Sequence, residues 1–318
     1  MCIRDSLTVA LCGIRCERLE QAHLVLAARF SDYEPEILNR ALQERRTLVR
    51  TWGVRGTLQI VPTSQLSLYL AAAGVSAPRW RRFLDARSNL ATPARLRHLR
   101  RLCPEVISRD ALREAIPDAT TRLFMLREAA QAGHIVLRDG DGQQATYAWT
   151  RVWLEKEVEP DRDYHALVAR YLTSYGPLDA ADLASWLGVT VAAARRLMAK
   201  HLVEEIPVED QALHSFMRPE DVESLARTRK SRARGLVVVP PGDPLVMAYK
   251  TRYRPPDTAA EEIGLAFLDG RPVASWTMSR GAISLQVTEA GLQGRIEKAI
   301  HKLLARAGVE AAFEEVQS

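Results

Sequence analysis

The chain has 318 residues, of which 47% are hydrophobic and 26% are charged, and its formal net charge is +5 at pH 7. This composition excludes a disordered protein and suffices for two or three folded units with real cores. The sequence contains neither an apolar run long enough to span a bilayer nor a visible export signal, so we expect a cytoplasmic protein that makes no membrane contact.

The first six residues, MCIRDS, correspond in frame to the end of a transposon adaptor used in sequencing libraries. We therefore interpret residues 1–6 as an artefact rather than as part of the fold, a genuine start with a short tail being the alternative. On this interpretation the first unit, residues 7–103, is truncated at its amino end.

Cysteine and histidine usage gives no sign of a disulfide framework or a metal site. Once Cys2 is set aside, Cys12, Cys16 and Cys103 are an odd number without a C-x-x-C pair, and the histidines are scattered without ligand spacing. We expect reduced thiols, no metal and no cofactor.

Residues 46–62, RTLVRTWGVRGTLQIVP, follow a helix predicted over about 34–46 and predict a tight two-stranded ribbon. Alternate apolar residues of the ribbon should face a core: Val49, Val54, Leu58 and Ile60. The same alternation displays Arg50, Trp52 and Arg55, and guanidinium groups along one side of a strand can meet phosphates. We expect these three residues to bind DNA, an ordinary solvated hairpin being the alternative.

Two blocks concentrate the positive charge. Between residues 79 and 101 eight arginines accompany one acid, and between residues 227 and 234 there are five cations and no acid. Such blocks suit a polyanion, although a solvated helix face and a basic linker are alternatives. Because Trp80 and Phe83 interleave with the first block, we expect DNA contacts from three of its arginines: Arg79, Arg81 and Arg82.

The second unit, residues 104–160, repeats the order helix, helix, hairpin. Its helices are predicted over 110–115, capped by Ser108, and over about 120–132. A hairpin with its turn at 139–142 follows, and Arg138 and Tyr147 on it should lie near DNA.

The third unit, residues 161–226, should contain helices from about 164, over 180–187 and over 191–201, followed by a strand. The last of these is a candidate recognition helix that carries Arg195, Arg196 and Lys200. The alternative is a helix with a cationic outer face and no DNA contact.

After a basic linker at 227–234, residues 235–318 change to short apolar segments with turns, which predict a small β-barrel-like domain closed by a helix. The strands are predicted at GLVVV, PLVMAY, IGLAFL, RPVASWTM and AISLQV. Asp243 should bond its local backbone within a turn. The predicted fold class is α+β: tandem winged helix-turn-helix units followed by the small β-barrel-like domain.

Four segments, in a consistent order, resemble the family of AlkZ-like DNA glycosylases, and the resemblance covers nearly the whole chain. In the ribbon the matching residues are Trp52, Arg55, Gly56, Thr57 and Leu58, with Gln59 in place of a family histidine. The other segments are 171–188, 235–249 and 268–276. The resemblance implies a winged-helix enzyme that hydrolyses the N-glycosidic bond of N7-alkylated purines in double-stranded DNA, as in base excision or crosslink unhooking.

The family's catalytic motif, Gln-x-Gln or Gln-x-Asp, precedes a helix that here is LEQAHLVLAARF, and counting back from Arg29 places Arg15, Cys16 and Glu17 on it. A carboxylate can orient water and stabilise a cationic sugar, so Glu17 is compatible with the acid-bearing motif. Arg15 would repel that cation, and could instead bind phosphate or pair with Glu17. An ordinary ion pair at a helix start is the alternative for both residues.

These observations favour a monomeric, monofunctional DNA glycosylase whose partner is alkylated or crosslinked double-stranded DNA. The first alternative is a catalytically inactive DNA-binding or regulatory protein of the same fold. A protein-interaction scaffold is the second.

Overall fold

The computed structural model describes residues 3–75, 77–87, 91–141, 144–207, 215–227, 234–249, 252–253 and 263–314, with backbone alone at 3–6, 77–80 and 290. The first part of the chain is mainly helical around one ribbon. Its elements are α1 (Ile3–Ala10), β1 (Ile14–Arg15), α2 (Leu19–Ala27), α3 (Pro35–Gln43), β2 (Leu48–Trp52), β3 (Leu58–Pro62), α4 (Leu66–Gly74), α5 (Ala77–Asp85) and α6 (Thr92–Leu102). Between β2 and β3 the 3-10 turn η1 covers Val54–Gly56.

The second part contains the predicted pair of helices and hairpin. Its elements are β4 (Val106–Ser108), α7 (Ala111–Ala115), α8 (Ala119–Gln131), β5 (Ile135–Asp139), β6 (Thr146–Trp149) and α9 (Thr150–Trp153). The cap expected at Ser108 is wrong, because Ser108 ends β4 and the N-cap of α7 is Asp110. Asp118 caps α8 instead, accepting a hydrogen bond from Thr121 N.

The two predicted hairpins join in one antiparallel sheet of six strands, in the order β1-β3-β2-β5-β6-β4. The join is made where β2 pairs with β5, at Arg50 and Leu137. Both edges of β2 are paired with strands, and α3, α4 and α8 pack against it, so its residues are buried. Val49, Val54, Leu58 and Ile60 are buried as predicted.

The third part consists of α10 (His165–Tyr175), α11 (Ala180–Leu187), α12 (Val191–Lys200), the pair β7 (Glu204–Ile206) and β8 (Ser215–Met217), and α13 (Pro219–Arg227). Local signals set the bounds of α11. Asp179 accepts a hydrogen bond from Asp182 N at its start, and Gly188 ends it in the left-handed conformation at φ 76°. The predicted range 180–187 is therefore confirmed.

The last part is a five-stranded sheet in the order β13-β12-β11-β10-β9, with one long helix. Its elements are β9 (Leu236–Val239), α14 (Pro244–Ala248), β10 (Gly264–Leu268), β11 (Arg271–Ser279), β12 (Ala282–Val287), α15 (Gln293–Ala307) and β13 (Ala312–Phe313). Among the described strands the sheet has two open edges, β13 and β9, so it is a half-barrel rather than the expected barrel.

The predicted strand PLVMAY is wrong, because this segment forms the short helix α14. Asp243 is its N-cap, accepting a hydrogen bond from Leu245 N, and Pro244 occupies the first turn. Both are ordinary helix-start signals, which outweigh the apolar character of the segment.

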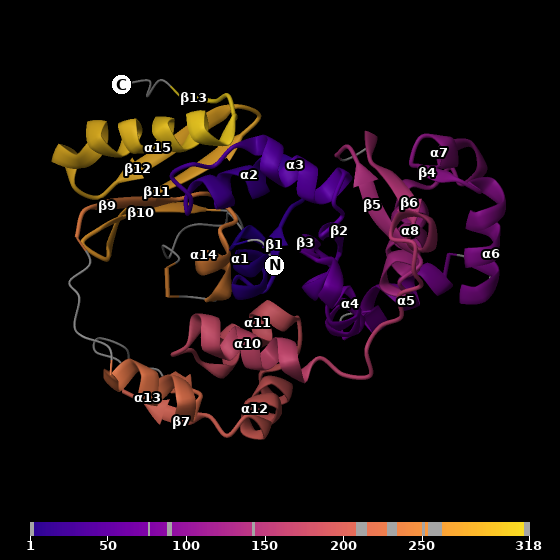
Figure 1. The fold of residues 1–318 in the computed structure, drawn as a ribbon, viewed down its shortest axis with the longest axis horizontal. Coiled ribbons are helices and arrows are strands. Elements are labelled where there is room, and N and C mark those ends of the chain that lie inside the picture. The colour runs from indigo at the N-terminus through magenta and orange to yellow at the C-terminus, as the bar shows by residue number, and fades with distance from the viewer. Residues whose placement is uncertain are drawn as a thin grey trace.

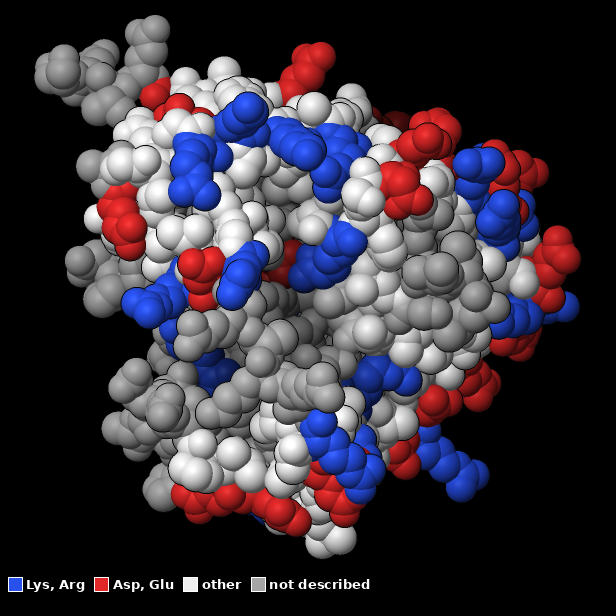
Figure 2. Space-filling view, turned by 60° about the vertical axis from the view of Figure 1, so that its left-hand side comes forward, with Lys and Arg blue, Asp and Glu red and all other residues white. Residues whose placement is uncertain are grey.

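The first and last parts of the chain share a core, in which Leu24 of α2 packs with Ile60 of β3, Trp276 of β11 and Ile300 of α15. Figure 1 shows α2 beside α15, and α1 and β1 between the C-terminal sheet and α10 and α11. On the face drawn in Figure 2 the surface is hollowed near its centre, and Lys and Arg side chains lie around the hollow. Within the described ranges no helix is both long and apolar enough to cross a membrane.

Candidate active site

Glu17 lies in the short loop between β1 and α2, where its carboxylate is held but not enclosed. The side chain is half-buried, and Oε1 accepts a hydrogen bond from Leu58 N at 3.1 Å. The backbone of the loop is fixed separately by Arg50, whose Nε donates to Cys16 O at 2.8 Å and whose Nη2 donates to Glu17 O at 2.6 Å. The loop therefore presents one carboxylate in a defined position.

The expected display of Arg50 and Trp52 along the ribbon is wrong. Arg50 is only 4% exposed, and besides the loop it binds Gly140 O at 3.1 Å and Asp141 Oδ1 at 2.6 Å. Trp52 is 3% exposed and stacks on Tyr147, with ring centroids 5.5 Å apart. Tyr147 is itself buried. These side chains connect the Glu17 loop to the hairpin of the second part instead of facing solvent.

Glu17 lies near the guanidinium of Arg127 and the neutral phenol of Tyr147. Arg127 on α8 is half-buried and sits against Gly56, where an added Cβ would lie 3.5 Å from its Nη1. Burial lowers the pKa of Arg127, and the Glu17 carboxylate opposes that shift. Burial raises the pKa of Tyr147 to about 12, and Glu17 adds to the rise. A carboxylate placed here has a guanidinium to balance its charge.

Cys16 is not a nucleophile in this arrangement. Burial raises the pKa of its thiol to about 12, with smaller contributions from neighbouring charges. Since the thiolate is the reactive form, a buried neutral thiol is inert. Cys12, Cys16 and Cys103 are free, as predicted. Within the described ranges no three His, Cys, Asp or Glu side chains gather as metal ligands would.

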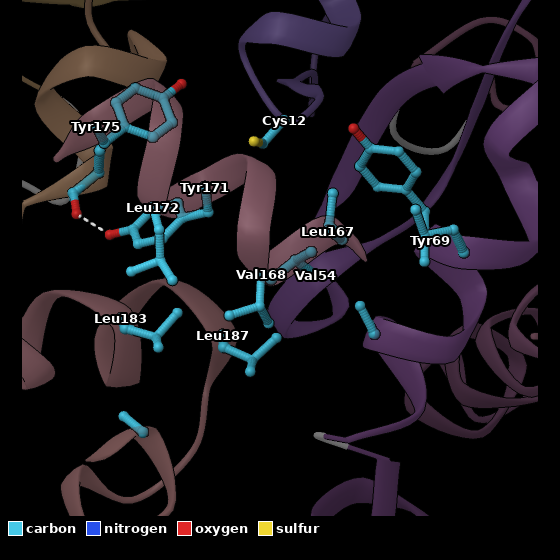
Figure 3. Close-up of a cluster of buried hydrophobic side chains, with 14 of the residues drawn as sticks. Cys12, Val54, Tyr69, Leu167, Val168, Tyr171, Leu172, Tyr175, Leu183 and Leu187 are labelled. Atoms are coloured by element: carbon cyan, nitrogen blue, oxygen red, sulfur yellow. Dashed lines mark hydrogen bonds between the residues drawn. The ribbon is translucent and has the colours of Figure 1, made fainter. Parts of the chain in front are cut away.

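A pocket opens beside the loop, between the ribbon and the third and last parts of the chain. It encloses about 490 Å³ of empty space, part of it open solvent. Its polar lining includes Arg15, Arg55, Gln59 and Tyr175, and Trp186 and Met247 supply apolar wall. Figure 3 shows how this junction is built, with Cys12 and Val54 on the first part facing Tyr175 and Leu187 on the third.

Gln59 fixes the ribbon turn next to this pocket. It is 8% exposed, lies opposite Arg15 in the β1–β3 pairing, and accepts a hydrogen bond from Val54 N at 3.2 Å through Oε1. A Cβ at Gly53 would lie 2.2 Å from that oxygen, so a larger residue there would displace the Gln59 amide from its hydrogen bond.

A family model described as "DNA glycosylase AlkZ-like" matches residues 10–318. The chain belongs to this family.

Two comparisons place it beside proteins from Streptomyces sahachiroi. The chain is 24% identical over 301 residues to an "Interstrand DNA cross-link repair glycosylase", covering 84% of this chain and 80% of the relative. The solved structure of "Streptomyces sahachiroi DNA glycosylase AlkZ" superposes with a TM-score of 0.74 at 19% identity, over 96% of this chain and 92% of that one. At this identity the superposition establishes the fold alone, an α+β fold.

In this AlkZ-like chain, the two residues predicted to lie on the catalytic motif, Arg15 and Glu17, have different surroundings. Arg15 lines the pocket, whereas Glu17 is absent from its described lining and contacts the ribbon backbone instead. The hydrogen bond from Leu58 N to Glu17 and the side chain of Gln59 come from consecutive residues of β3. The sequence pointed to both motif residues but gave no sign of the opposite wall, which comes from α10, α11 and α14.

All but one of the remaining predicted DNA-binding residues have exposed side chains, and the other, Arg79, lies where the structure describes only the backbone. The exposed residues are Arg55, Arg81, Arg82, Arg138, Arg195, Arg196 and Lys200. Most of the basic linker lies outside the described residues. Arg95, from the first arginine block, is 2% exposed and pairs with Glu128 at 2.8 Å and Asp85 at 2.9 Å. Arg95 therefore forms a buried ion pair with α8 instead of adding charge to the surface.

Sequence reasoning missed the partner of Asp243. This carboxylate is fully buried and forms two hydrogen bonds with Arg29, at 2.7 and 2.8 Å, in addition to the predicted bond to its local backbone. Burial opposes the charge on Arg29, but the hydrogen bond and charge of Asp243 outweigh it, and the pKa of Arg29 is raised. The end of α2 is thereby tied to α14.

Proposed function

We propose that this chain is a monofunctional glycosylase that binds double-stranded DNA and hydrolyses the N-glycosidic bond of N7-alkylated purines, including those in crosslinks. It would act as a monomer in the cytoplasm, without a cofactor. The observation that carries the proposal is the Glu17 carboxylate, which is half-buried, held by Leu58 N and located at the start of α2. Membership of the AlkZ-like family supports the reaction class.

The chemistry requires little more than such a carboxylate. An N7-alkylated purine is cationic, so its glycosidic bond is already weakened. A catalyst then needs to orient a water toward C1′ and to stabilise positive charge on the sugar. Glu17 can accept a proton from that water and face the cationic sugar. Arg50 supports this role by holding the carbonyls of Cys16 and Glu17, because a fixed loop loses less entropy when the transition state forms.

We also interpret the three successive groups of helices and hairpin as winged-helix units. The arrangement of α7, α8, β5 and β6, and that of α11, α12, β7 and β8, support this interpretation. The exposed arginines of α5 and α12 would bind phosphates and give affinity that falls with salt and depends little on sequence.

The test is release of base from a duplex that contains one 7-methylguanine. We expect the Glu17→Ala variant to lose at least about 100-fold in rate, the lower range for a general base, while duplex affinity is retained. Glu20→Ala is a matched control, because Glu20 lies in the first turn of α2 and pairs with Arg18 at 2.7 Å. Equal rates for Glu17→Ala and the control would contradict the role of Glu17.

A catalytically inactive DNA-binding or regulatory protein is the second candidate, because Arg-Cys-Glu departs from the Gln-x-Gln and Gln-x-Asp motifs. It would be favoured by tight, salt-dependent duplex binding without release of any alkylated purine. Replacing Arg195, Arg196 and Lys200 by alanine together should then weaken binding and flatten its salt dependence.

A further inference from the structure

The polar side chains of the pocket beside Arg15 favour a ligand that accepts hydrogen bonds. Arg15 and Arg55 can only donate, because a guanidinium has no acceptor. Gln59 uses Oε1 for Val54 N at 3.2 Å, and its Nε2 donates over a long 3.4 Å to Thr57 Oγ1, so a second N–H of the amide remains for a ligand. The described lining contains no carboxylate. A carbonyl or anionic oxygen fits this pocket better than a donor does.

The apolar walls suit a flat ring. Trp186 lines the pocket and is held by stacking on Tyr171, with ring centroids 4.2 Å apart and planes 17° apart. Val54 and Met247 add apolar surface. A few directed polar groups within apolar and aromatic walls are typical of sites for small heterocycles.

Two adjacent residues of β3 contact Glu17 and line the pocket, respectively. Leu58 N binds the Glu17 carboxylate, and the next residue, Gln59, lines the pocket. When water displaces a leaving group from a sugar with inversion, it attacks from the face opposite to the departing group. A carboxylate that lies outside the base pocket, but next to it, satisfies this requirement.

We infer that the pocket receives the purine base that leaves the sugar, and that Arg15 and Gln59 donate hydrogen bonds to the carbonyl oxygen at C6 of a guanine-type base. This inference rests on the hydrolysis proposed above. It gives Arg15 a place on the leaving-base side of the reaction, where its charge does not face the sugar.

The water oxygen forms a bond to C1′ while the C1′–N9 bond breaks, and the bonding electron pair passes to N9, which cancels the positive charge of the alkylated base. One proton of the water passes to Glu17 and then to solvent. Because electron density on the C6 oxygen rises as the bond breaks, Arg15 binds the departing neutral base more strongly than the cationic base of the substrate. Such differential binding accelerates the reaction.

The first experiment measures binding of free 7-methylguanine and 7-methyladenine to the full chain, by ligand-observed NMR and by tryptophan fluorescence. We expect 7-methylguanine to bind at least about tenfold more tightly than 7-methyladenine, whose C6 carries an amino group, and Arg15→Met or Gln59→Leu to remove that preference. Arg18→Met is the matched control, since Arg18 pairs with Glu20 and is not among the described lining. Absence of 7-methylguanine binding at millimolar concentration, or equal binding to Arg15→Met, would overturn the inference.

The second experiment compares base release from duplexes with 7-methylguanine and with 7-methyladenine. We expect Arg15→Met to slow release of the first at least about tenfold while leaving the second nearly unchanged, a difference that a merely structural role would not produce. Equal losses for both lesions contradict recognition of the C6 oxygen. Release by the unaltered chain without binding of free base overturns the pocket assignment and keeps the glycosylase. Binding of free base without release from any lesion keeps the pocket and overturns the proposed hydrolysis.

Discussion

Two arginines hold the segment that carries Glu17, one at each end, and they do so in different ways: Arg50 is buried, whereas the Arg29 side chain is 21% exposed. Arg50, at the start, distributes its donors over the carbonyls of Cys16, Glu17 and Gly140 and over Asp141, a carboxylate that is 39% exposed. Arg29, just after α2, donates to Val25 O at 3.0 Å and binds a single carboxylate, Asp243, through both terminal nitrogens; that carboxylate has no exposure. Asp243 therefore depends on Arg29 far more than the acceptors of Arg50 depend on Arg50.

The largest effect is expected for Arg29→Ala. Removing the guanidinium leaves Asp243 buried without its charge partner, so we expect the free energy of unfolding to fall by about 3–5 kcal/mol. Urea unfolding measures this loss, and the double variant Arg29→Ala/Asp243→Ala should be less unstable than the sum of the single variants. Arg227→Ala, which breaks an exposed pair with Glu223, should change stability by less than about 0.5 kcal/mol. Strict additivity at Arg29 and Asp243 would contradict the comparison.

A smaller effect is expected for Arg50→Lys. An ammonium keeps the charge but cannot reach three carbonyls that a planar guanidinium reaches together, so we expect a loss of about 2 kcal/mol in stability. Amide hydrogen exchange in the loop at residues 16–18 should accelerate, and base release should slow with it. If the loop exchanges at the rate of the unaltered chain, Arg50 does not fix it.

The smallest expected effect is a dependence of stability on pH that arises from His23 on α2. Burial lowers the pKa of His23, whose Nδ1 lies 2.6 Å from Tyr33 Oη, below its ordinary value of 6.5. Between the two pKa values, His23 binds a proton in the unfolded chain but stays neutral in the folded chain. This contribution to stability is full above pH 6.5 and is lost as the pH falls from there toward the lowered pKa of the folded state. The urea midpoint should drop between pH 7.5 and 5.5, and His23→Gln should reduce that drop more than His301→Gln, on the exposed face of α15. Equal drops in the two variants would exclude His23 as the source.

Two elements show which features local sequence determines: the helix α11, and α14, a helix whose segment was expected to be a strand. The bounds of α11 follow from Asp179 and Gly188, signals that act within a few residues. The start signals of α14, Asp243 and Pro244, are equally local, whereas the apolar composition of PLVMAY favours a strand. The N-cap and the proline at the first position predict α14 better than composition does.

The burial of Arg50 could not be predicted in the same way. Alternation along β2 separates two faces but does not tell which helices cover them or which strand joins its edge, and the partner on β5, Leu137, lies 87 residues beyond Arg50. The Arg29–Asp243 pair joins residues 214 positions apart. Within the candidate site, Glu17 and Arg15 were found from local order before α2, whereas the pocket wall at Tyr175, Trp186 and Met247 depends on how distant parts pack.

The core shared by α2 and α15 has a consequence for synthesis on the ribosome. The segment that carries Glu17 leaves the ribosome long before α15, the helix that completes its core and ends at Ala307. Contacts between residues so far apart form late, after the long intervening chain has been closed into a loop. The nascent chain therefore holds the Glu17 loop without its complete core until α15 has emerged.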